Sequence, residues 1–328
     1  MPFFRRRKPW EQPGLQETPE PRVNEWAALS RRGWMALAAG GIAAAGGAAV
    51  WWRFGPEEAA AEEKSNKTAP RSAFFPAKRN EEFELDRPLT DEAAAARYNN
   101  FYEFSTGKRV TPYVKEWDPS DWKIEVAGLV ERPATFTMDE LGRRFPYEER
   151  LYRHRCVETW AMAVPWTGFP LRKLIEHVKP LASAKFVKFV SLDHTKVKGA
   201  RRTSKSEPFP YTEGLSIAEA ANELTLLATG IFGHALPKQH GTPVRLVVPW
   251  KYGFKGAKSL VRIEFVERRP ATFWTTLGPE EYDFVANVNP KVPHPRWSQA
   301  TEWDVGTRER RPTLPFNGYG ELVAKLYG

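Results

Sequence analysis

The chain of 328 residues has a single cysteine, Cys156, so no intramolecular disulfide can stabilise its fold. The structure must be held together by a buried core, and the sequence provides one, since 41% of the residues are hydrophobic and 13% are aromatic. This composition is that of a globular protein rather than a disordered or fibrous one. The 13 tryptophans and 28 prolines favour many loops and short strands over a helical bundle.

The N-terminal region has the pattern of a bacterial export signal. The pair Arg31-Arg32 precedes an Ala- and Gly-rich run that reaches Trp52 without a charged residue. Twin-arginine signals export proteins that have already folded, so we predict a twin-arginine signal region at residues 1–61 and a periplasmic location. Residues 59–61 (AAA) offer a cleavage site, and retention of the apolar run as a membrane anchor is the alternative. Folding before export is typical of proteins that receive a cofactor in the cytoplasm.

The remainder of the chain is predicted to be a linker at residues 62–80 and one folded domain at residues 81–328. Apolar spacing and capping residues predict helices at 91–97, from Thr137 and at 171–178, and alternating or β-branched runs predict strands at 121–127, 186–190, 244–248 and 260–266. No internal repeat occurs, and strands and helices do not alternate as a doubly wound sheet requires. We therefore predict an α+β fold with mixed sheets.

The net charge of the chain is +9, and residues 1–61 contribute little to it, with eight basic and six acidic side chains. The predicted domain is therefore basic, which favours an anionic ligand or an anionic membrane surface. Nucleic acid is not predicted as a partner, because the basic residues are scattered and no nucleic-acid-binding motif occurs. The sequence also has no zinc-ligand spacing, P-loop, G-x-G-x-x-G or G-x-S-x-G motif.

The cysteine lies in the segment RHRCVETW (153–160), for which three interpretations are open. Cys156 can be an inert buried residue, or a nucleophile that pairs with a distant histidine, as in a cysteine hydrolase. Alternatively, Arg153 and Arg155 favour the thiolate, which is a good soft ligand for a metal but fills one coordination position only. A metal bound in this way needs its other ligands from a separate group.

The segment VRLVVPWKYGFKGAKS (244–259) is the candidate binding site for such a group. Its lysines Lys251, Lys255 and Lys258, together with two glycines, can surround a phosphate with ammonium groups and backbone N–H groups. The alternative is a basic hairpin on the surface. Thiolate and loop together suggest an organic metal cofactor that carries a phosphate.

Five segments closely resemble one family: YNNFYEF (98–104), RCVETW (155–160), VPWTGFPL (164–171), VRLVVPWKYGFKGAKS (244–259) and NVNPKVPHPRWSQATE (287–302). The family is that of the catalytic subunits of periplasmic protein-methionine-sulfoxide reductases, and the similarity runs from about residue 80 to 325. It implies a sulfite-oxidase-like fold, a molybdenum-molybdopterin cofactor and oxygen-atom transfer from methionine sulfoxide residues of oxidised periplasmic proteins.

The resemblance also implies roles for individual residues. Cys156 is expected to ligate molybdenum, and the expected cofactor contacts are Asn99, Tyr102, Glu103, Ser191, His240, Arg245, Gly256, Ala257 and Lys258. Two of these differ from the family pattern, because Ser191 replaces a threonine and His240 replaces an asparagine.

Electrons must come from outside the chain, since it has no C-x-x-C-H haem motif, no iron–sulfur cysteine set and no flavin fingerprint. The resemblance implies a haem-containing integral membrane subunit as the donor, in a heterodimer. Two further alternatives are an oxidoreductase for sulfite or another small oxoanion on the same fold, and a cofactor-free periplasmic binding protein.

Overall fold

The computed structural model describes residues 74–328. The predicted signal region at residues 1–61 and residues 62–73 of the predicted linker lie outside the described residues. The last residues of that linker lie beside strand β3 (Glu148–Arg155), where the amide of Asn80 donates to the carbonyl of Glu149 at 2.8 Å. Within residues 74–328 no helix is both long and apolar enough to cross a membrane.

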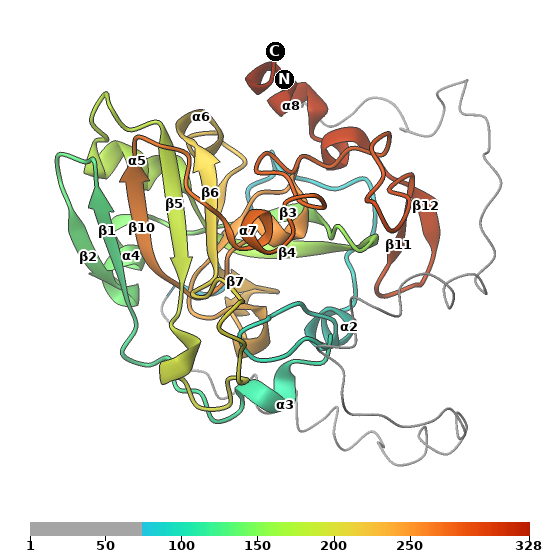
Figure 1. Cartoon of the computed structure of the whole chain (residues 1–328), viewed down its shortest axis with the longest axis horizontal. Helices are drawn as coiled ribbons and strands as arrows, with labels where there is room; N and C mark the ends of the chain where they lie inside the picture. Colours follow the sequence, from blue (N-terminus) through green and yellow to red (C-terminus); the bar gives the residue numbers. More distant parts are fainter. Residues whose placement is uncertain (1–73) are drawn as a thin grey trace. The chain divides into compact units, whose positions relative to one another are not determined.

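One sheet has five strands in the order β2-β1-β10-β5-β6 (Figure 1). Strands β1 and β10 run parallel and the other neighbours run antiparallel, so the sheet is mixed. Its strands are β1 (Lys123–Gly128), β2 (Ala134–Thr137), β5 (Phe186–Ser191), β6 (Thr212–Ser216) and β10 (Leu260–Val266).

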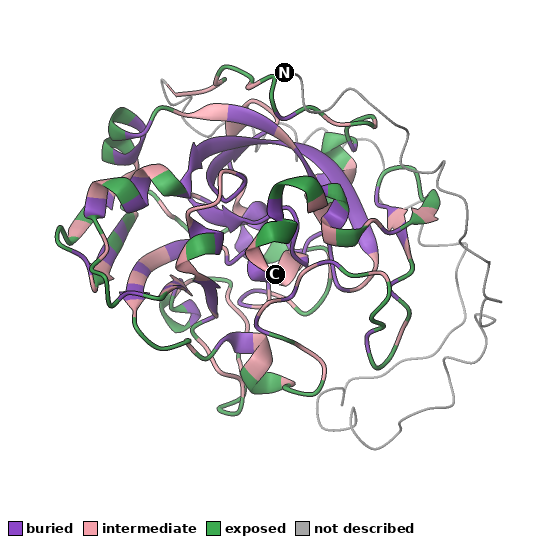
Figure 2. Ribbon diagram, turned by 90° about the horizontal axis from the view of Figure 1, so that it is seen from above, coloured by how far each residue is buried: buried purple, intermediate pink, exposed green. Residues whose placement is uncertain are grey.

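The second sheet has seven strands and is built around β4, whose eleven residues are all buried. Strand β4 pairs antiparallel with β3 and β7 and parallel with β11, so this sheet is also mixed. Figure 2 shows the buried residues concentrated in the strands and the exposed residues in the surrounding helices and loops. The strands are β3, β4 (Trp160–Pro170), β7 (Leu226–Ile231), β8 (His234–Ala235), β9 (Arg245–Val247), β11 (Thr301–Asp304) and β12 (Arg310–Pro312).

The helices are short and lie around the sheets (Figure 1). They are α2 (Glu92–Arg97), α3 (Thr111–Val114), α4 (Met138–Arg144), α5 (Leu171–Val178), α6 (Ile217–Ala220), α7 (Phe273–Leu277) and α8 (Gly320–Val323). The part of the chain that the structure describes also has five 3₁₀ turns: η2 (His194–Lys196), η3 (Lys238–His240), η4 (Gly253–Lys255), η5 (Pro315–Gly318) and η6 (Ala324–Leu326).

The predicted α+β fold with mixed sheets is confirmed, and so are the elements that local chemistry specifies. Helix α4 begins with the capping box of Thr137 and Glu140, in which each side chain bonds the backbone N–H of the other residue. Helix α5 follows the apolar spacing expected at 171–178 and buries that face. The four predicted strands correspond to β1, β5, β9 and β10.

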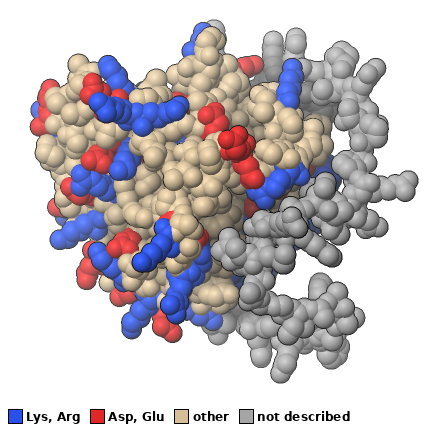
Figure 3. Space-filling model, in the orientation of Figure 1, with Lys and Arg blue, Asp and Glu red and all other residues tan. Residues whose placement is uncertain are grey.

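The basic segment 244–259 is not a surface hairpin. Lys251 forms an ion pair with Glu219 at 2.5 Å, and Lys255 forms one with Glu213 at 2.7 Å. All four side chains are buried. On the face seen in Figure 3, the Lys and Arg side chains that reach the surface are interspersed with Asp and Glu. Two of the three lysines assigned to a phosphate are therefore structural, because each already has a buried carboxylate partner.

We predict that removing Lys255 alone is more damaging than removing its whole ion pair. Burial raises the pKa of Glu213 and Lys255 opposes this effect, so Lys255→Met leaves an uncompensated acid in the core. The free energy of unfolding should fall by about 3–5 kcal/mol in the single variant, and Glu213→Gln added to it should restore much of that loss. Urea unfolding of both variants measures this, and equal stabilities would contradict it.

Candidate active site

A hollow of about 840 Å³, counting the solvent-filled space at its mouth, lies beside Cys156, at the end of β3. The hollow is lined by residues that are far apart in the sequence. They come from the segment after α2, the β3–β4 turn, η3 and the segment that contains η4. Among the described residues, seven aromatic side chains line it: Tyr102, Trp160, Trp166, Tyr211, Phe254, Trp274 and Tyr282.

Cys156 is held in the tight turn between β3 and β4. Its amide donates to the carbonyl of Trp160 at 2.9 Å, and the amide of Thr159 donates to the carbonyl of Cys156 at 3.0 Å. The thiol faces Asn100, with Nδ2 3.6 Å from Sγ, and Glu158, with Oε2 3.7 Å from Sγ. Within residues 74–328 no imidazole is in hydrogen-bond contact with Sγ, so the pairing that a cysteine hydrolase needs is absent there.

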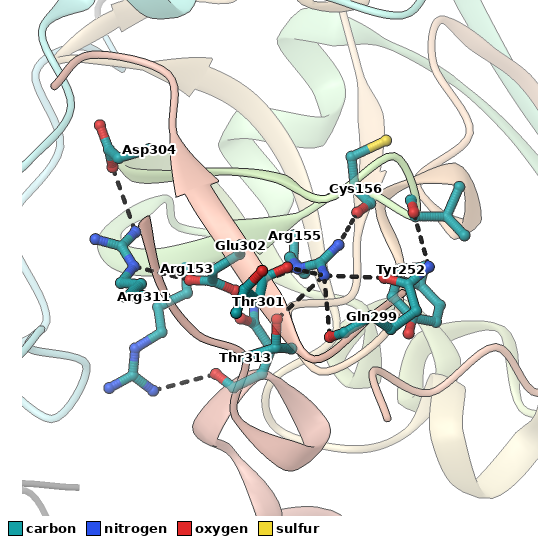
Figure 4. A network of polar contacts seen from close by, with 12 residues as sticks. Arg153, Arg155, Cys156, Tyr252, Gln299, Thr301, Glu302, Asp304, Arg311 and Thr313 are labelled. Atoms are coloured by element: carbon teal, nitrogen blue, oxygen red, sulfur yellow. Dashed lines mark hydrogen bonds and ion pairs between the residues drawn. The ribbon is translucent and has the colours of Figure 1, made fainter. Parts of the chain in front are cut away.

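The two arginines predicted to favour the thiolate do not produce one, because burial raises the pKa of Cys156 more than Arg155 lowers it. Side chains alternate along β3, so both arginines point away from the face to which His154 belongs. Arg155 pairs with Glu302 at 3.2 Å, and Arg153 pairs with Asp86 at 2.8 Å. Figure 4 shows the sulfur of Cys156 turned away from the guanidinium of Arg155, which instead bonds the Cys156 carbonyl.

Burial therefore determines the protonation of the thiol. Cys156 is 4% exposed, and burial followed by the negative charge of Glu158 raises its pKa to about 12. Lys108 and Arg155 oppose this rise without cancelling it. In the protein alone Cys156 is a neutral thiol, and a cation placed in the hollow is needed to make it a thiolate.

Glu158 is a site residue that the sequence did not reveal. Its Oε2 accepts bonds from Asn100 Nδ2 and Trp160 Nε1, both at 2.9 Å, and it forms a short ion pair with Lys108. Burial raises the pKa of Glu158, but Lys108 and these hydrogen bonds outweigh burial, and the net pKa is lowered. A carboxylate is thus held ionised beside the thiol.

Arg245 is a buried cation. Its side chain bonds only main-chain carbonyls, including those of His240 at 3.0 Å and Gly256 at 3.4 Å, and stacks over Trp166 at 4.9 Å. Within residues 74–328 no carboxylate pairs with it, and burial lowers its pKa to about 10. Burial and Arg245 also lower the pKa of the nearby Lys258, which Glu103 opposes. Such a pair of cations favours an anionic ligand.

Two histidines complete this part of the hollow. Burial, then Arg245 and Lys258, lowers the pKa of both His154 and His240 to about 3, so both imidazoles are neutral at physiological pH. A neutral imidazole offers one N–H donor and one acceptor. His154 was missed by sequence reasoning, although its position two residues before Cys156 on a strand predicts the same face.

The comparisons with known proteins agree with this chemistry. A family model described as "oxidoreductase molybdopterin binding domain" matches residues 111–274. The chain is 51% identical over 241 residues to the protein-methionine-sulfoxide reductase catalytic subunit MsrP of Campylobacter jejuni, an alignment that covers 73% of this chain and 81% of that protein. The chain belongs to this family.

A structural likeness is more distant. The crystal structure of the sulfane dehydrogenase SoxCD from Paracoccus pantotrophus matches with a TM-score of 0.41 and 17% identity. The match covers 77% of this chain, which spans 60% of the length of that one. A likeness of this size bears on neither fold nor activity.

The hollow fits the molybdopterin of the family on several counts. Arg245 lacks an anion, and a phosphate provides one. Gly256 leaves Arg245 its place in the hollow, since a Cβ there would lie 2.8 Å from the carbonyl oxygen of Leu246 and 2.9 Å from Nη2 of Arg245. Within residues 74–328 there is no group of three or more side chains that could hold a metal ion. A metal bound by Cys156 would therefore take its other ligands from a cofactor.

Most residues predicted to contact the cofactor meet at this hollow. Those that line it, besides Cys156, are Asn99, Tyr102, Glu103, His240, Arg245, Gly256 and Lys258. Asn99 already donates to the carbonyls of Ala95 and Ala96 at the end of α2, which leaves its oxygen as an acceptor.

Two predicted contacts, Ser191 and Ala257, do not line the hollow. Ser191 is buried in β5, and its hydroxyl has no hydrogen-bond partner. The amide of Ala257 donates to the Lys255 carbonyl at 3.1 Å, and its carbonyl accepts from the Leu246 amide at 2.9 Å. The roles of both residues stay predictions.

Arg245→Ala should lower the cofactor content of the purified protein. The substitution removes a charge-assisted contact to a phosphate, which is worth about 1.5–3 kcal/mol. Metal and pterin analysis measures the content, with Arg262→Ala as the matched control, because Arg262 is a partly exposed arginine paired with Glu125 on the other sheet. Full loading of the Arg245 variant would contradict the assigned role.

Proposed function

We propose that the chain is the catalytic subunit of a periplasmic reductase for methionine sulfoxide residues in proteins. The observation that carries the proposal is a buried thiol in one hollow with an unpaired buried arginine, in a chain 51% identical to a reductase of this name. When bound, the molybdenum cofactor accepts the sulfoxide oxygen and supplies two electrons. The net reaction converts methionine sulfoxide, two electrons and two protons into methionine and water.

The residues of the chain are proposed to bind the metal and to hold the protons that the reaction consumes. Cys156 is proposed as the protein ligand of molybdenum, since its thiolate is a soft ligand and lines the same hollow as the predicted cofactor contacts. The ion pair of Glu158 and Lys108 puts an ionisable group within 3.7 Å of Sγ, where a proton can be held for the released oxygen. The aromatic walls exclude water around the sulfoxide.

The electrons are proposed to come from a haem-containing integral membrane subunit, as the family resemblance implies. The absence of any haem, iron–sulfur or flavin motif in the sequence supports an external donor. A periplasmic location, reached by the twin-arginine pathway, follows from Arg31-Arg32 and the uncharged run behind them.

A second candidate activity is the oxidation of sulfite or another small oxoanion. The cations Arg245 and Lys258 favour it, because they suit a free oxoanion as well as a cofactor phosphate. Assays of the purified protein with methionine sulfoxide and with sulfite separate the two. We expect sulfoxide reduction with a reduced dye as donor, and sulfite turnover without it would reverse the assignment.

Cys156→Ser should abolish sulfoxide reduction while the fold survives. A hydroxyl is a poor ligand for a soft metal site, and serine fits the volume of the buried thiol. The measurement is the rate with methionine sulfoxide, accompanied by thermal unfolding and by the companion variant Cys156→Ala. Near-normal turnover by either variant would contradict the role of Cys156.

Lys108→Met should move the limb of the pH–rate profile that reports the ionisation of Glu158 to higher pH. Lys108 is the main cause that lowers the pKa of Glu158, so without it the carboxylate is protonated at a higher pH. Lys196→Met, which removes an exposed lysine paired with Asp193, should leave the profile unchanged. Identical profiles for wild type and Lys108→Met would show that Glu158 has no part in the rate.

A further inference from the structure

A second hollow lies directly beside the first. It is an open hollow of about 1200 Å³, counting the solvent-filled space at its mouth, and it shares three wall residues with the thiol's hollow: Val157, Phe254 and Tyr282. Most of its other wall comes from residues 281–294, a stretch that overlaps the segment NVNPKVPHPRWSQATE (287–302). We call this second hollow the lateral groove. No predicted cofactor contact lies in it.

The groove is fixed in position relative to the thiol. Trp297 Nε1 and Gln299 Nε2 both donate to the carbonyl of Val157, at 2.7 and 2.8 Å. Val157 directly follows Cys156, and Figure 4 shows Gln299 beside the guanidinium of Arg155, to which its Oε1 is bonded at 2.9 Å. These hydrogen bonds connect the wall of the groove directly to the turn that carries Cys156.

The buried lysines of the basic segment bind another part of this wall, residues 284–287. Lys251 Nζ donates to the carbonyl of Val285 at 2.6 Å and to Asn287 Oδ1 at 2.9 Å. Lys255 Nζ donates to the carbonyl of Phe284 at 2.8 Å. The two lysines that a phosphate does not need thus fix the chain that lines the groove.

The surface of the groove suits a polypeptide of varied sequence. Val292 is 60% exposed on its rim, next to the exposed Pro293, and provides apolar contact. The charges nearby are of both signs, since Asp283 and Lys291 are exposed and Glu281 is paired with Arg296 at 2.6 Å. The rim therefore has no strong preference for either sign of charge.

We propose that the lateral groove binds the main chain that flanks the oxidised methionine of a protein substrate. This inference rests on the proposed function. When a methionine sulfoxide side chain enters the thiol's hollow, its backbone stays at the mouth, and each extended neighbour occupies about 3.3–3.6 Å of adjoining surface. The groove is continuous with that mouth through the shared wall residues, and its mixed charge matches a substrate class with no common sequence.

The test compares a peptide with a small sulfoxide on the loaded enzyme. The peptide is uncharged and has methionine sulfoxide between flanking residues, and the small substrate is N-acetyl methionine sulfoxide. Val292→Asp places a charge on the rim, and Leu181→Asp is the matched control, since Leu181 is 41% exposed and lines neither hollow. Fluorescence anisotropy of the labelled, reduced form of the peptide measures binding without turnover.

Val292→Asp should raise the KM for the peptide and weaken its binding by about tenfold, with kcat and the kinetics of the small sulfoxide unchanged. Leu181→Asp should alter none of these. Unchanged peptide kinetics and binding in Val292→Asp, or equal losses for both substrates, would overturn the inference. A Val292→Asp variant that differs only in oligomeric state would also overturn it and assign the rim to a second copy of the chain.

The failure of the proposed function is a separate outcome. A wild type that reduces neither substrate refutes the proposed function, and anisotropy then still decides whether the groove binds a peptide. A wild type that reduces both substrates, with Val292→Asp unaffected, leaves the proposed function intact and refutes the groove.

Discussion

The burial of a single thiol governs the chemistry of this structure. Cys156 lies in a turn between two buried strands, and desolvation keeps it protonated when nothing else is bound, since its pKa is raised to about 12. Arg155 opposes this rise only weakly, and both flanking arginines pair with carboxylates, Arg153 with Asp86 and Arg155 with Glu302. A thiolate is stable there only next to a cation, so the site is built for a metal rather than for nucleophilic attack.

The basic segment divides its charges between structure and binding. Lys251 and Lys255 neutralise buried glutamates and fix the wall of the lateral groove. Arg245 has no carboxylate partner within the described residues and faces the hollow of the thiol. The segment 244–259 therefore contributes to both hollows. The role of each cation follows from its partners: those paired with carboxylates are structural, and Arg245 is available to a ligand.

Part of this arrangement could be predicted from the sequence. The capping box before α4 and the apolar spacing of α5 are local signals, and the structure follows both. Strand β4 was not predicted, because a strand buried on both faces has no alternation to detect. The segments carrying the family resemblance do converge on the thiol, but the pair of Lys108 and Glu158 joins residues fifty positions apart and leaves no pattern in the sequence. The orientation of Arg153 and Arg155 could have been found, since strand alternation alone places them opposite His154.

The most direct test of the account is X-ray absorption spectroscopy at the molybdenum edge, on wild type and Cys156→Ser loaded to equal pterin content. The account predicts one more sulfur neighbour of molybdenum in the wild type than in the variant, beyond the sulfurs that the pterin supplies. The same sulfur coordination in both proteins would contradict it, because the metal would then have no bond to the thiol of this chain.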